Sequence, residues 1–324
     1  MKAALCRQFG GPEVIEIADL PDPQPGPGEV VIDVGAVSLN FFDTLIIRNA
    51  YQYKPDFPFS PGAEIAGKVS AIGEGVAGVE PGARVMAYIR WNGCREKALA
   101  PASALVPLPD SVSDEVASGL TVTYGTAMHA FQDRGRLQPG ETVAVLGASG
   151  GAGLAAVQVA KRIGARVIAA ASSPEKLAVA RAAGADEGID YAKTDLKQAL
   201  KDLTDGRGAD LVYDCVGGPY AEPALRATAW EGRYLVVGFA AGEIPKIPLN
   251  LLLLKGCAAV GVFWGAFSEK FPERNAANVA RVVEWCAEGK LEPHIHGRFP
   301  LEQTRAALEI IDRREAKGKV VVCP

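Results

Sequence analysis

The chain of 324 residues has few of the patterns that carry metal or disulfide chemistry. It holds six cysteines, none of them in a C-x-x-C pair, and only three histidines. Such spacing argues against a zinc ribbon and against a redox dithiol, and isolated cysteines are most often buried as small apolar residues. We therefore expect most of the cysteines to be buried and the protein to work in a reducing cytoplasm.

Long apolar runs and a surplus of positive charge are also missing. No apolar stretch approaches the ~20 residues that span a bilayer, and "MKAALCRQFG" at the start is not typical of a signal peptide. The formal net charge is −4, so the chain has no general basic field for nucleic acid or anionic lipid. The sequence therefore predicts neither a membrane nor a nucleic-acid partner.

Two kinds of local pattern divide the chain. Up to about residue 115, short β-type runs such as "EVVIDVGAVSL" alternate with stretches rich in Pro, Gly and Ser, which predicts a mostly antiparallel β domain. From about Thr142, apolar runs such as "TVAVLG" and "ARVIAAA" alternate with helical spacing, which predicts a parallel sheet covered by helices. The final strand-like run, "GKVVVCP", needs a sheet to join, and we expect it to join the first domain.

A glycine cluster lies between the first strand and the first helix of the second region. The stretch "VAVLGASGGAGLAAVQVAK" places Gly150, Gly151, Ala152 and Gly153 at the start of the helix. Glycines there let a pyrophosphate approach the backbone, where free N–H groups and the helix dipole favour an anion. Because a strand precedes the cluster and a helix follows it, we expect a dinucleotide site.

The next strand ends in two serines where an NAD-selective site would place a carboxylate for the ribose 2′-hydroxyl. Ser172, Ser173 and Lys176 instead offer hydroxyls and a cation, which suit a 2′-phosphate, and Tyr191 ends the following strand. The cofactor favoured by this pattern is NADPH. The same serines also fit a helix start, with Ser173 as N-cap before Pro174, and Glu175 remains a carboxylate that suits a ribose.

Six stretches resemble the medium-chain dehydrogenase/reductase superfamily and, within it, the zinc-independent quinone oxidoreductase branch. In chain order they are "GAVSLNFFDTLIIRNAY", "FPFSPGAEIAGKVSAIGEGV", "GLTVTYGTAMHAF", "GASGGAGLAAVQVAK", "LVYDCVGG" and "LVVGFA". The resemblance implies an α/β fold class: a Rossmann doubly wound parallel sheet, residues 119–267, beside a GroES-like mostly antiparallel β domain, residues 1–118 and 268–324. It places the active site in the cleft between the two.

The resemblance also bears on metal. Zinc-dependent members of the superfamily use a cysteine where this chain has Asn40 and a histidine where it has Ala63, and a third ligand would fall near Ser118. Since zinc needs three or four ligands, chiefly thiolates and imidazoles, and these positions offer none, we expect no metal. Glu64 and Asp43 are present, but as two carboxylates without partners they are expected to be structural.

Residues of the expected site follow from the resemblance. Asn40 is the expected donor to the cofactor or a substrate oxygen, and Tyr51 is a candidate proton donor, because Leu45 stands where relatives often carry a tyrosine. Tyr53 is a second candidate, and proton delivery from solvent is the default expectation. Further expected cofactor contacts follow the strand ends or line the nicotinamide pocket: Tyr124, Cys215, Gly238, Phe239, Ala240, Phe263 and Trp264.

These observations lead to an NADPH-dependent, zinc-free reductase of quinones as the first hypothesis. A reductase of enones or enoyl thioesters is the second, and a non-catalytic NADPH-binding structural or RNA-binding protein is the third. Both enzyme hypotheses have a small-molecule substrate, a quinone or an enone. The resemblance implies a homodimer, with "CAAVGVF" as the strand at the contact.

Overall fold

The computed structural model describes all residues, Met1–Pro324, and separates into two compact units. The first unit combines Met1–Val122 with Val279–Pro324, and the second is Thr123–Asn278. Both divisions fall later in the chain than the expected ones at 118 and 267. No helix in the chain is both long and apolar enough to cross a bilayer.

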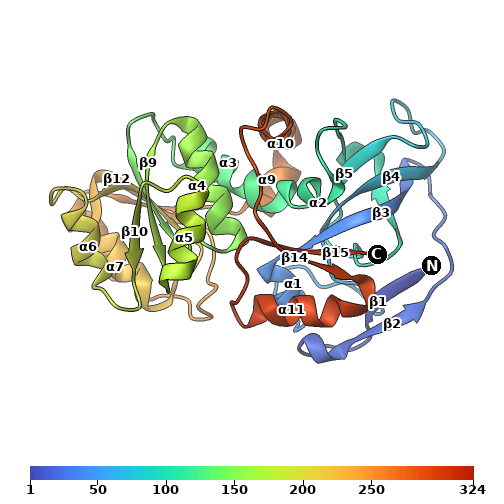
Figure 1. Cartoon of the computed structure of the whole chain (residues 1–324), viewed down its shortest axis with the longest axis horizontal. Helices are drawn as coiled ribbons and strands as arrows, with labels where there is room; N and C mark the ends of the chain where they lie inside the picture. The colour runs from blue at the N-terminus through green and yellow to red at the C-terminus, as the bar shows by residue number, and fades with distance from the viewer. The chain divides into compact units, whose positions relative to one another are not determined.

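The second unit is built on a six-stranded parallel sheet, of which Figure 1 labels the three strands β9, β10 and β12. The strand order of the sheet is β10-β9-β8-β11-β12-β13. This order, with the first strand at the centre and the chain winding outward in both directions, is that of the Rossmann fold. The strands are β8 (Thr142–Leu146), β9 (Arg166–Ala171), β10 (Glu187–Asp190), β11 (Ala209–Asp214), β12 (Thr228–Val236) and β13 (Ala258–Gly261). The expected doubly wound sheet is confirmed.

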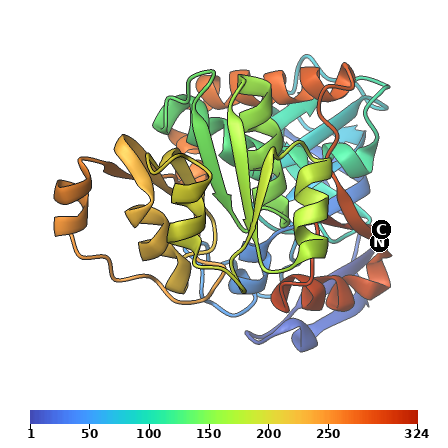
Figure 2. The same cartoon turned by 60° about the vertical axis from the view of Figure 1, so that its left-hand side comes forward.

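Helices cover both faces of this sheet (Figure 2). The helices of this unit are α3 (Gly125–Met128), α4 (Gly151–Ile163), α5 (Pro174–Ala182), α6 (Leu196–Asp202), α7 (Ala221–Arg226), α8 (Asn250–Lys255) and α9 (Trp264–Lys270). The helices α6, α7 and α8 bury Leu200, Leu225 and Leu251 against strand residues such as Ile168 and Val212. The helices α4 and α5 pack on β8, β9 and β10 from the other side, because right-handed crossovers place them there.

The first unit contains a seven-stranded sheet of order β14-β15-β3-β4-β5-β7, with β6 paired to β3, and a separate pair β1-β2. The strands are β1 (Lys2–Cys6), β2 (Ile15–Asp19), β3 (Glu29–Leu39), β4 (Glu64–Ile72), β5 (Arg84–Tyr88), β6 (Lys97–Pro101), β7 (Leu105–Pro107), β14 (Ile295–Pro300) and β15 (Lys319–Cys323). All pairings except β14-β15 are antiparallel. The expectation that the last strand joins the first domain is confirmed.

Short helices close this first unit: α1 (Phe41–Ile46), α2 (Asp114–Ala117) and α11 (Thr304–Asp312), while α10 (Pro272–Ala287) contains the second division between the units. The register around β3 matters for the site. Ser38 pairs with Glu64 of β4 on one side and with Val321 of β15 on the other. The first residues of β4 and β15 therefore lie at the end of β3, where Asn40 follows.

Candidate functional site

The predicted cofactor residues of the second unit follow the carboxyl ends of its parallel strands. In parallel doubly wound sheets this is the edge at which ligands bind. In sheet order, the residues are Tyr191 after β10, Ser172, Ser173 and Lys176 after β9, Gly150–Gly153 after β8, Cys215 after β11, Gly238–Ala240 after β12 and Phe263–Trp264 after β13. The sheet thus brings segments far apart in sequence to one edge.

The N-terminus of α4 is open to a ligand. Its N-cap, Gly150, offers no side-chain hydrogen bond, whereas α2, α5 and α6 are capped by Ser113, Ser173 and Asp195. The first N–H groups of a helix have no acceptor within it, so those of α4 remain available to an anion such as a pyrophosphate.

Close packing behind this loop requires Gly153. A Cβ on Gly153 would overlap the Gly147 carbonyl oxygen and lie 2.7 Å from the Ala148 Cα. The same atom on Gly150 would meet nothing nearer than 3.7 Å. Gly153 therefore serves the contact between helix and strand, and Gly150 leaves space on the ligand side.

Ser172, Lys176 and Tyr191 form a polar group at the end of β9. The Lys176 ammonium donates to the Ser172 Oγ at 3.1 Å, and the Tyr191 N–H donates to the carbonyl of Ala171, the residue before Ser172, at 3.1 Å. Burial raises the pKa of Tyr191 to about 12, so its phenol is neutral at physiological pH. One cation and two hydroxyls converge here, a set that suits a phosphate.

Ser173 caps the helix α5. Its Oγ accepts from the Lys176 N–H at 3.3 Å, as the N-cap of α5, with Pro174 in the first helical position.

A buried carboxylate holds the loop after β11 and connects it to β12. Asp214 is 3% exposed, and its Oδ1 accepts from the N–H groups of Val216 and Gly217, both at 2.8 Å. Its Oδ2 accepts from the Tyr234 hydroxyl. The neighbouring Cys215 donates to the Leu146 carbonyl at 3.2 Å, and burial raises the pKa of its thiol to about 12. The half-buried Cys215 is therefore protonated at neutral pH.

The aromatic candidates of this unit differ in exposure. Tyr124 is 1% exposed and donates to the Gln158 Oε1 of α4 at 2.8 Å. Trp264 is 5% exposed; its Nε1 donates to the Asn275 Oδ1, and its ring fills the space beside Gly125. Phe263 is 47% exposed and is the most exposed of the three.

In the first unit, Asn40 lies in a buried polar cluster. Its Nδ2 donates to the Glu64 Oε1 at 2.9 Å, and its Oδ1 accepts from the Lys319 ammonium at 2.8 Å. Lys319 also donates to the Glu64 Oε1 at 2.8 Å. The second oxygen of Glu64 accepts from the Thr121 hydroxyl and the Val122 N–H as well.

Asp43, the other carboxylate noted in the sequence, is fully buried beside this cluster. It accepts from the N–H groups of Asn40 at 2.7 Å and Gly62 at 2.9 Å. Burial raises the pKa of Asp43 to about 7 in spite of these two donors. Asp43 thereby holds the backbone at Asn40 in place.

Tyr51 belongs to an aromatic group in the same unit. Its ring stacks on Phe42 at 5.3 Å and meets Tyr53 edge to face at 5.6 Å, and Arg90 lies over the Tyr53 ring at 5.7 Å. Burial raises the pKa of Tyr51 to about 12. A neutral phenol can donate a proton, but the role predicted for Tyr51 stays a prediction.

The chain has no evident metal site. No three His, Cys, Asp or Glu side chains are grouped so that they could hold a metal ion. His129, one of the three histidines, is instead bound through Nδ1 to Asp133 at 2.9 Å and stacks on Phe267.

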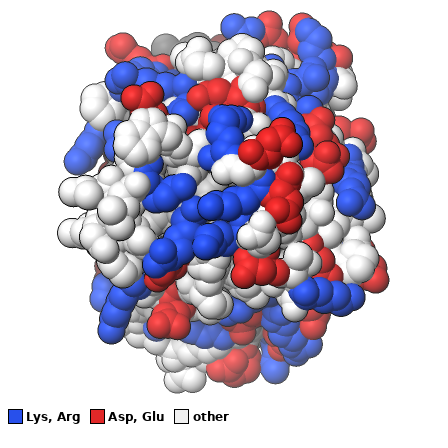
Figure 3. All heavy atoms as spheres, turned by 90° about the vertical axis from the view of Figure 1, so that its left-hand side faces the viewer, with Lys and Arg blue, Asp and Glu red and all other residues white.

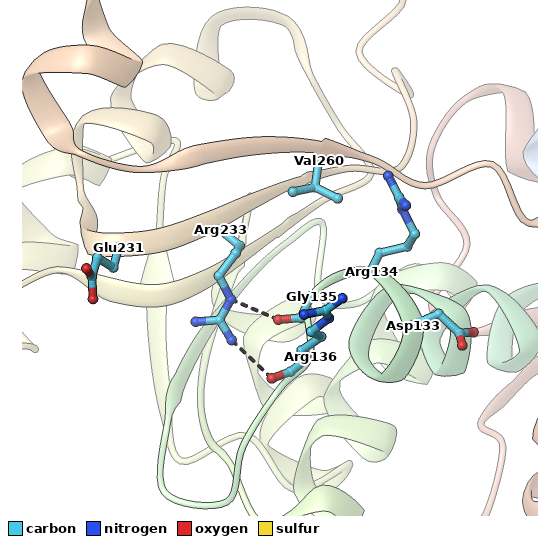
Figure 4. A pocket seen from close by; sticks show the side chains of 7 residues that line it. All are labelled: Asp133, Arg134, Gly135, Arg136, Glu231, Arg233 and Val260. Carbon is cyan, nitrogen blue, oxygen red and sulfur yellow. Dashed lines mark hydrogen bonds between the residues drawn. The ribbon is translucent and has the colours of Figure 1, made fainter.

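A surface pocket of about 430 Å³ lies elsewhere in the second unit (Figure 4). Its side chains include Arg134, Arg136 and Arg233, and Arg233 donates to the carbonyls of Gly135 and Arg136. Arg233 is also neutralised by Glu141 at 2.8 Å. The pocket lies before the start of β8 and along β12 and β13, away from the glycine loop, and includes none of the predicted residues.

Sequence reasoning missed Lys319 altogether. The lysine is separated from Glu64 by 255 positions, and a lysine opening a short apolar strand gives no local sign that it is buried. The indication that the sequence did contain was Glu64 itself, because a carboxylate in an apolar stretch needs a partner when it is buried.

Comparisons with known proteins agree with this architecture. Residues 26–110 match the family model of the alcohol dehydrogenase GroES-like domain, and residues 151–281 match that of the zinc-binding dehydrogenase. The chain is 39% identical over 324 residues to the quinone oxidoreductase-like protein 2 homolog of Nematostella vectensis, covering 99% of this chain and 88% of that protein.

Solved structures superpose over the whole chain. A mycobacterial protein crystallised with NADPH is 31% identical with a TM-score of 0.93, covering 100% of both chains. A structure described as an NAD-dependent alcohol dehydrogenase is also 31% identical, with a TM-score of 0.91 and the same coverage. The chain belongs to the medium-chain dehydrogenase/reductase superfamily and, within it, to the quinone oxidoreductase branch.

Proposed function

We propose that the protein is an NADPH-dependent, zinc-free oxidoreductase that transfers hydride to quinones. The observation that carries this proposal is the edge of the parallel sheet, where the uncapped N-terminus of α4 lies one strand away from the group of Ser172, Lys176 and Tyr191. One site suits a pyrophosphate and the other suits a 2′-phosphate.

Similarity of fold does not choose between the two nicotinamide cofactors. The two solved structures above are equally identical to this chain, and one is described with NADPH and the other as NAD-dependent. The choice therefore rests on local residues. No carboxylate occupies positions 171–173. The Lys176 ammonium instead donates to the Ser172 hydroxyl at the end of β9. This arrangement favours NADPH.

In this proposal, the residues of the chain bind and orient the cofactor and the acceptor. NADPH, when bound, supplies the hydride. The α4 N-terminus would hold its pyrophosphate, Ser172 and Lys176 its 2′-phosphate, and Asn40 would donate to the cofactor or to an acceptor oxygen. Since Asn40, Ala63 and Ser118 offer no thiolate or imidazole, the acceptor must accept hydride without a polarising metal. Quinones do so, because the charge spreads onto oxygen.

The surface charge is compatible with a small-molecule substrate. Figure 3 shows Lys and Arg side chains gathered near the centre of one face, with Asp and Glu side chains among them. Nucleic-acid binding would call for a continuous basic stripe, so a small-molecule acceptor remains the better fit.

An acceptor panel tests the proposed function. We expect chelator-treated protein to oxidise NADPH, followed at 340 nm, faster with 1,4-benzoquinone than with an α,β-unsaturated ketone. Faster turnover of the ketone would identify an enone reductase instead. Turnover that disappears on chelation and returns with zinc would refute the zinc-free proposal, and no turnover with any acceptor would favour the non-catalytic hypothesis.

We also propose a homodimer formed through the edge strand β13. This strand pairs only with β12, and Ala258, Ala259 and Gly261 are exposed along it. The strand β13 itself contains no charged residue or proline, the residues that usually protect an exposed edge. One arginine, Arg134, donates to the carbonyl of its last residue, Gly261, at 2.9 Å. Trp230, Leu253 and Leu254 add exposed apolar surface of the same unit, at 71%, 77% and 65% exposure.

Replacing Leu253 and Leu254 by glutamate is expected to convert the protein to a monomer, because two carboxylates would lose hydration at the interface. Light scattering after size exclusion should give twice 34.0 kDa for the wild type and 34.0 kDa for the variant. Leu99→Glu, which changes an exposed leucine of β6, is the matched control and should stay dimeric. A monomeric wild type would refute the proposal.

A further inference from the structure

The ion pair between Lys319 and Glu64 lies fully inside the first unit. Lys319 is 3% exposed and Glu64 is 0% exposed. Such a pair is a weak source of stability, because removing two charges from water costs about as much as their attraction returns. A pair of apolar side chains would fill the same space at no such cost. Its presence therefore calls for a role besides stability.

The contacts of the pair converge on one side chain. The three hydrogen-bond acceptors around the Lys319 ammonium are the Glu64 Oε1, the Asn40 Oδ1 and the Leu39 carbonyl, at 2.8, 2.8 and 3.5 Å. The other oxygen of Glu64, Oε2, accepts from the Thr121 hydroxyl at 2.6 Å and from the Val122 N–H at 2.8 Å. Gly119 leaves room for the lysine, since a Cβ there would lie 3.2 Å from its Cγ and Cε.

This arrangement fixes which way the Asn40 carboxamide faces. An ammonium only donates and a carboxylate only accepts, so Oδ1 must face Lys319 and Nδ2 must face Glu64. One Nδ2 hydrogen is used by Glu64 at 2.9 Å. The second has only the Ser38 carbonyl, at 3.5 Å, which is the limit of a hydrogen bond. That second hydrogen is the one left for a ligand.

We propose that Lys319 and Glu64 are positioning residues for the reaction: together they orient the Asn40 carboxamide so that one N–H is presented to the nicotinamide or to the acceptor oxygen. The proposal rests on the proposed function for its catalytic consequence. Its structural content, the fixed carboxamide, stands on the contacts above and is measurable without turnover.

The first test observes the carboxamide directly. The chain has six asparagines, so ¹⁵N-asparagine labelling gives a simple spectrum in which Asn40→Ala identifies the Asn40 side-chain signal. In the wild type we expect proton shifts displaced from those of a free asparagine side chain and slow exchange with water. In Lys319→Met the shifts should move toward the free values and exchange with water should become faster. An unchanged Asn40 signal in Lys319→Met would overturn the proposal, whether or not the protein is active.

The second test is a double-mutant cycle on kcat and KM. Lys319→Met is expected to lower kcat by about 10- to 100-fold, the cost of a misplaced catalytic contact, with the KM for NADPH within about threefold. In the Asn40→Ala background the same change should cost less than about twofold, because the residue acts through Asn40. An undiminished effect in that background, or a wild-type rate in Asn40→Ala, would overturn the inference while leaving the proposed function intact.

A double variant separates the loss of carboxamide orientation from a loss of folding. Lys319→Met leaves the Glu64 carboxylate buried without its cation, which is strongly destabilising. Lys319→Met combined with Glu64→Gln removes both charges and should keep a melting temperature close to that of the wild type. It should still lose the fixed carboxamide, since glutamine can turn either end toward Asn40. A wild-type Asn40 signal in this folded variant would count against the proposal.

Discussion

Lys176→Ala is expected to raise the KM for NADPH by about 10- to 100-fold and to leave the KM for NADH within about twofold. The physical reason is that a charge-assisted hydrogen bond contributes about 1.5–3 kcal/mol, and only NADPH carries the phosphate that Lys176 would meet. The Lys176 ammonium already lies 3.1 Å from the Ser172 Oγ, so the two groups can bind one phosphate together. Initial rates at 340 nm with both cofactors provide the measurement.

Two comparisons make this result specific. Lys68→Ala removes an exposed positive charge from β4 and should change neither KM. Ser172→Ala should weaken NADPH alone, whereas Ser173→Ala should lower stability by about 1 kcal/mol through loss of the α5 cap and leave cofactor preference unchanged. Equal losses with NADPH and NADH in Lys176→Ala would mean that the lysine does not meet the 2′-phosphate.

Gly153→Ala is expected to destabilise the fold by several kcal/mol, among the largest effects of any single substitution here. Its Cβ would overlap the Gly147 carbonyl oxygen and approach the Ala148 Cα at 2.7 Å, and both are backbone atoms that cannot turn aside. Either β8 or α4 must shift, which costs more than the about 1–3 kcal/mol of an ordinary overpacked core. Urea unfolding of the apoprotein measures the loss.

Gly150→Ala is the matched control. Its added Cβ would have no neighbour closer than 3.7 Å and its φ is −77°, so stability should change by less than about 0.5 kcal/mol. The same methyl group would stand where the pyrophosphate approaches, and NADPH affinity should fall at least about tenfold. If Gly150→Ala bound NADPH like the wild type, the placement of the pyrophosphate over α4 would be wrong.

Much of the second unit was predictable because its determinants are local. Gly164 ends α4 with a left-handed φ of 97°, and Ser173 with Pro174 starts α5, both as the sequence indicates. Strand–helix alternation then forces the parallel sheet and brings every strand end to one edge. The cofactor residues could be listed from sequence for that reason, since each follows a recognisable strand.

The first unit could be predicted only in outline. The partner of Glu64 lies at the other end of the chain, and only the pairing of β15 with β3 brings Lys319 to it. The exposure of individual side chains was not predictable from the sequence either. Trp264 and Phe263 are neighbours in sequence, yet Trp264 is buried against Gly125 and Phe263 is half exposed. Long-range pairing and side-chain direction are settled by packing, which no local pattern reports.

The measurement that tests the central claim most directly is the ratio of kcat/KM for NADPH to that for NADH, with 1,4-benzoquinone as acceptor and chelator-treated wild-type protein. Because one charge-assisted contact to the 2′-phosphate contributes about 1.5–3 kcal/mol, the ratio should exceed about 10. A ratio near or below one would show that Ser172 and Lys176 do not select the cofactor and would contradict the account of this site.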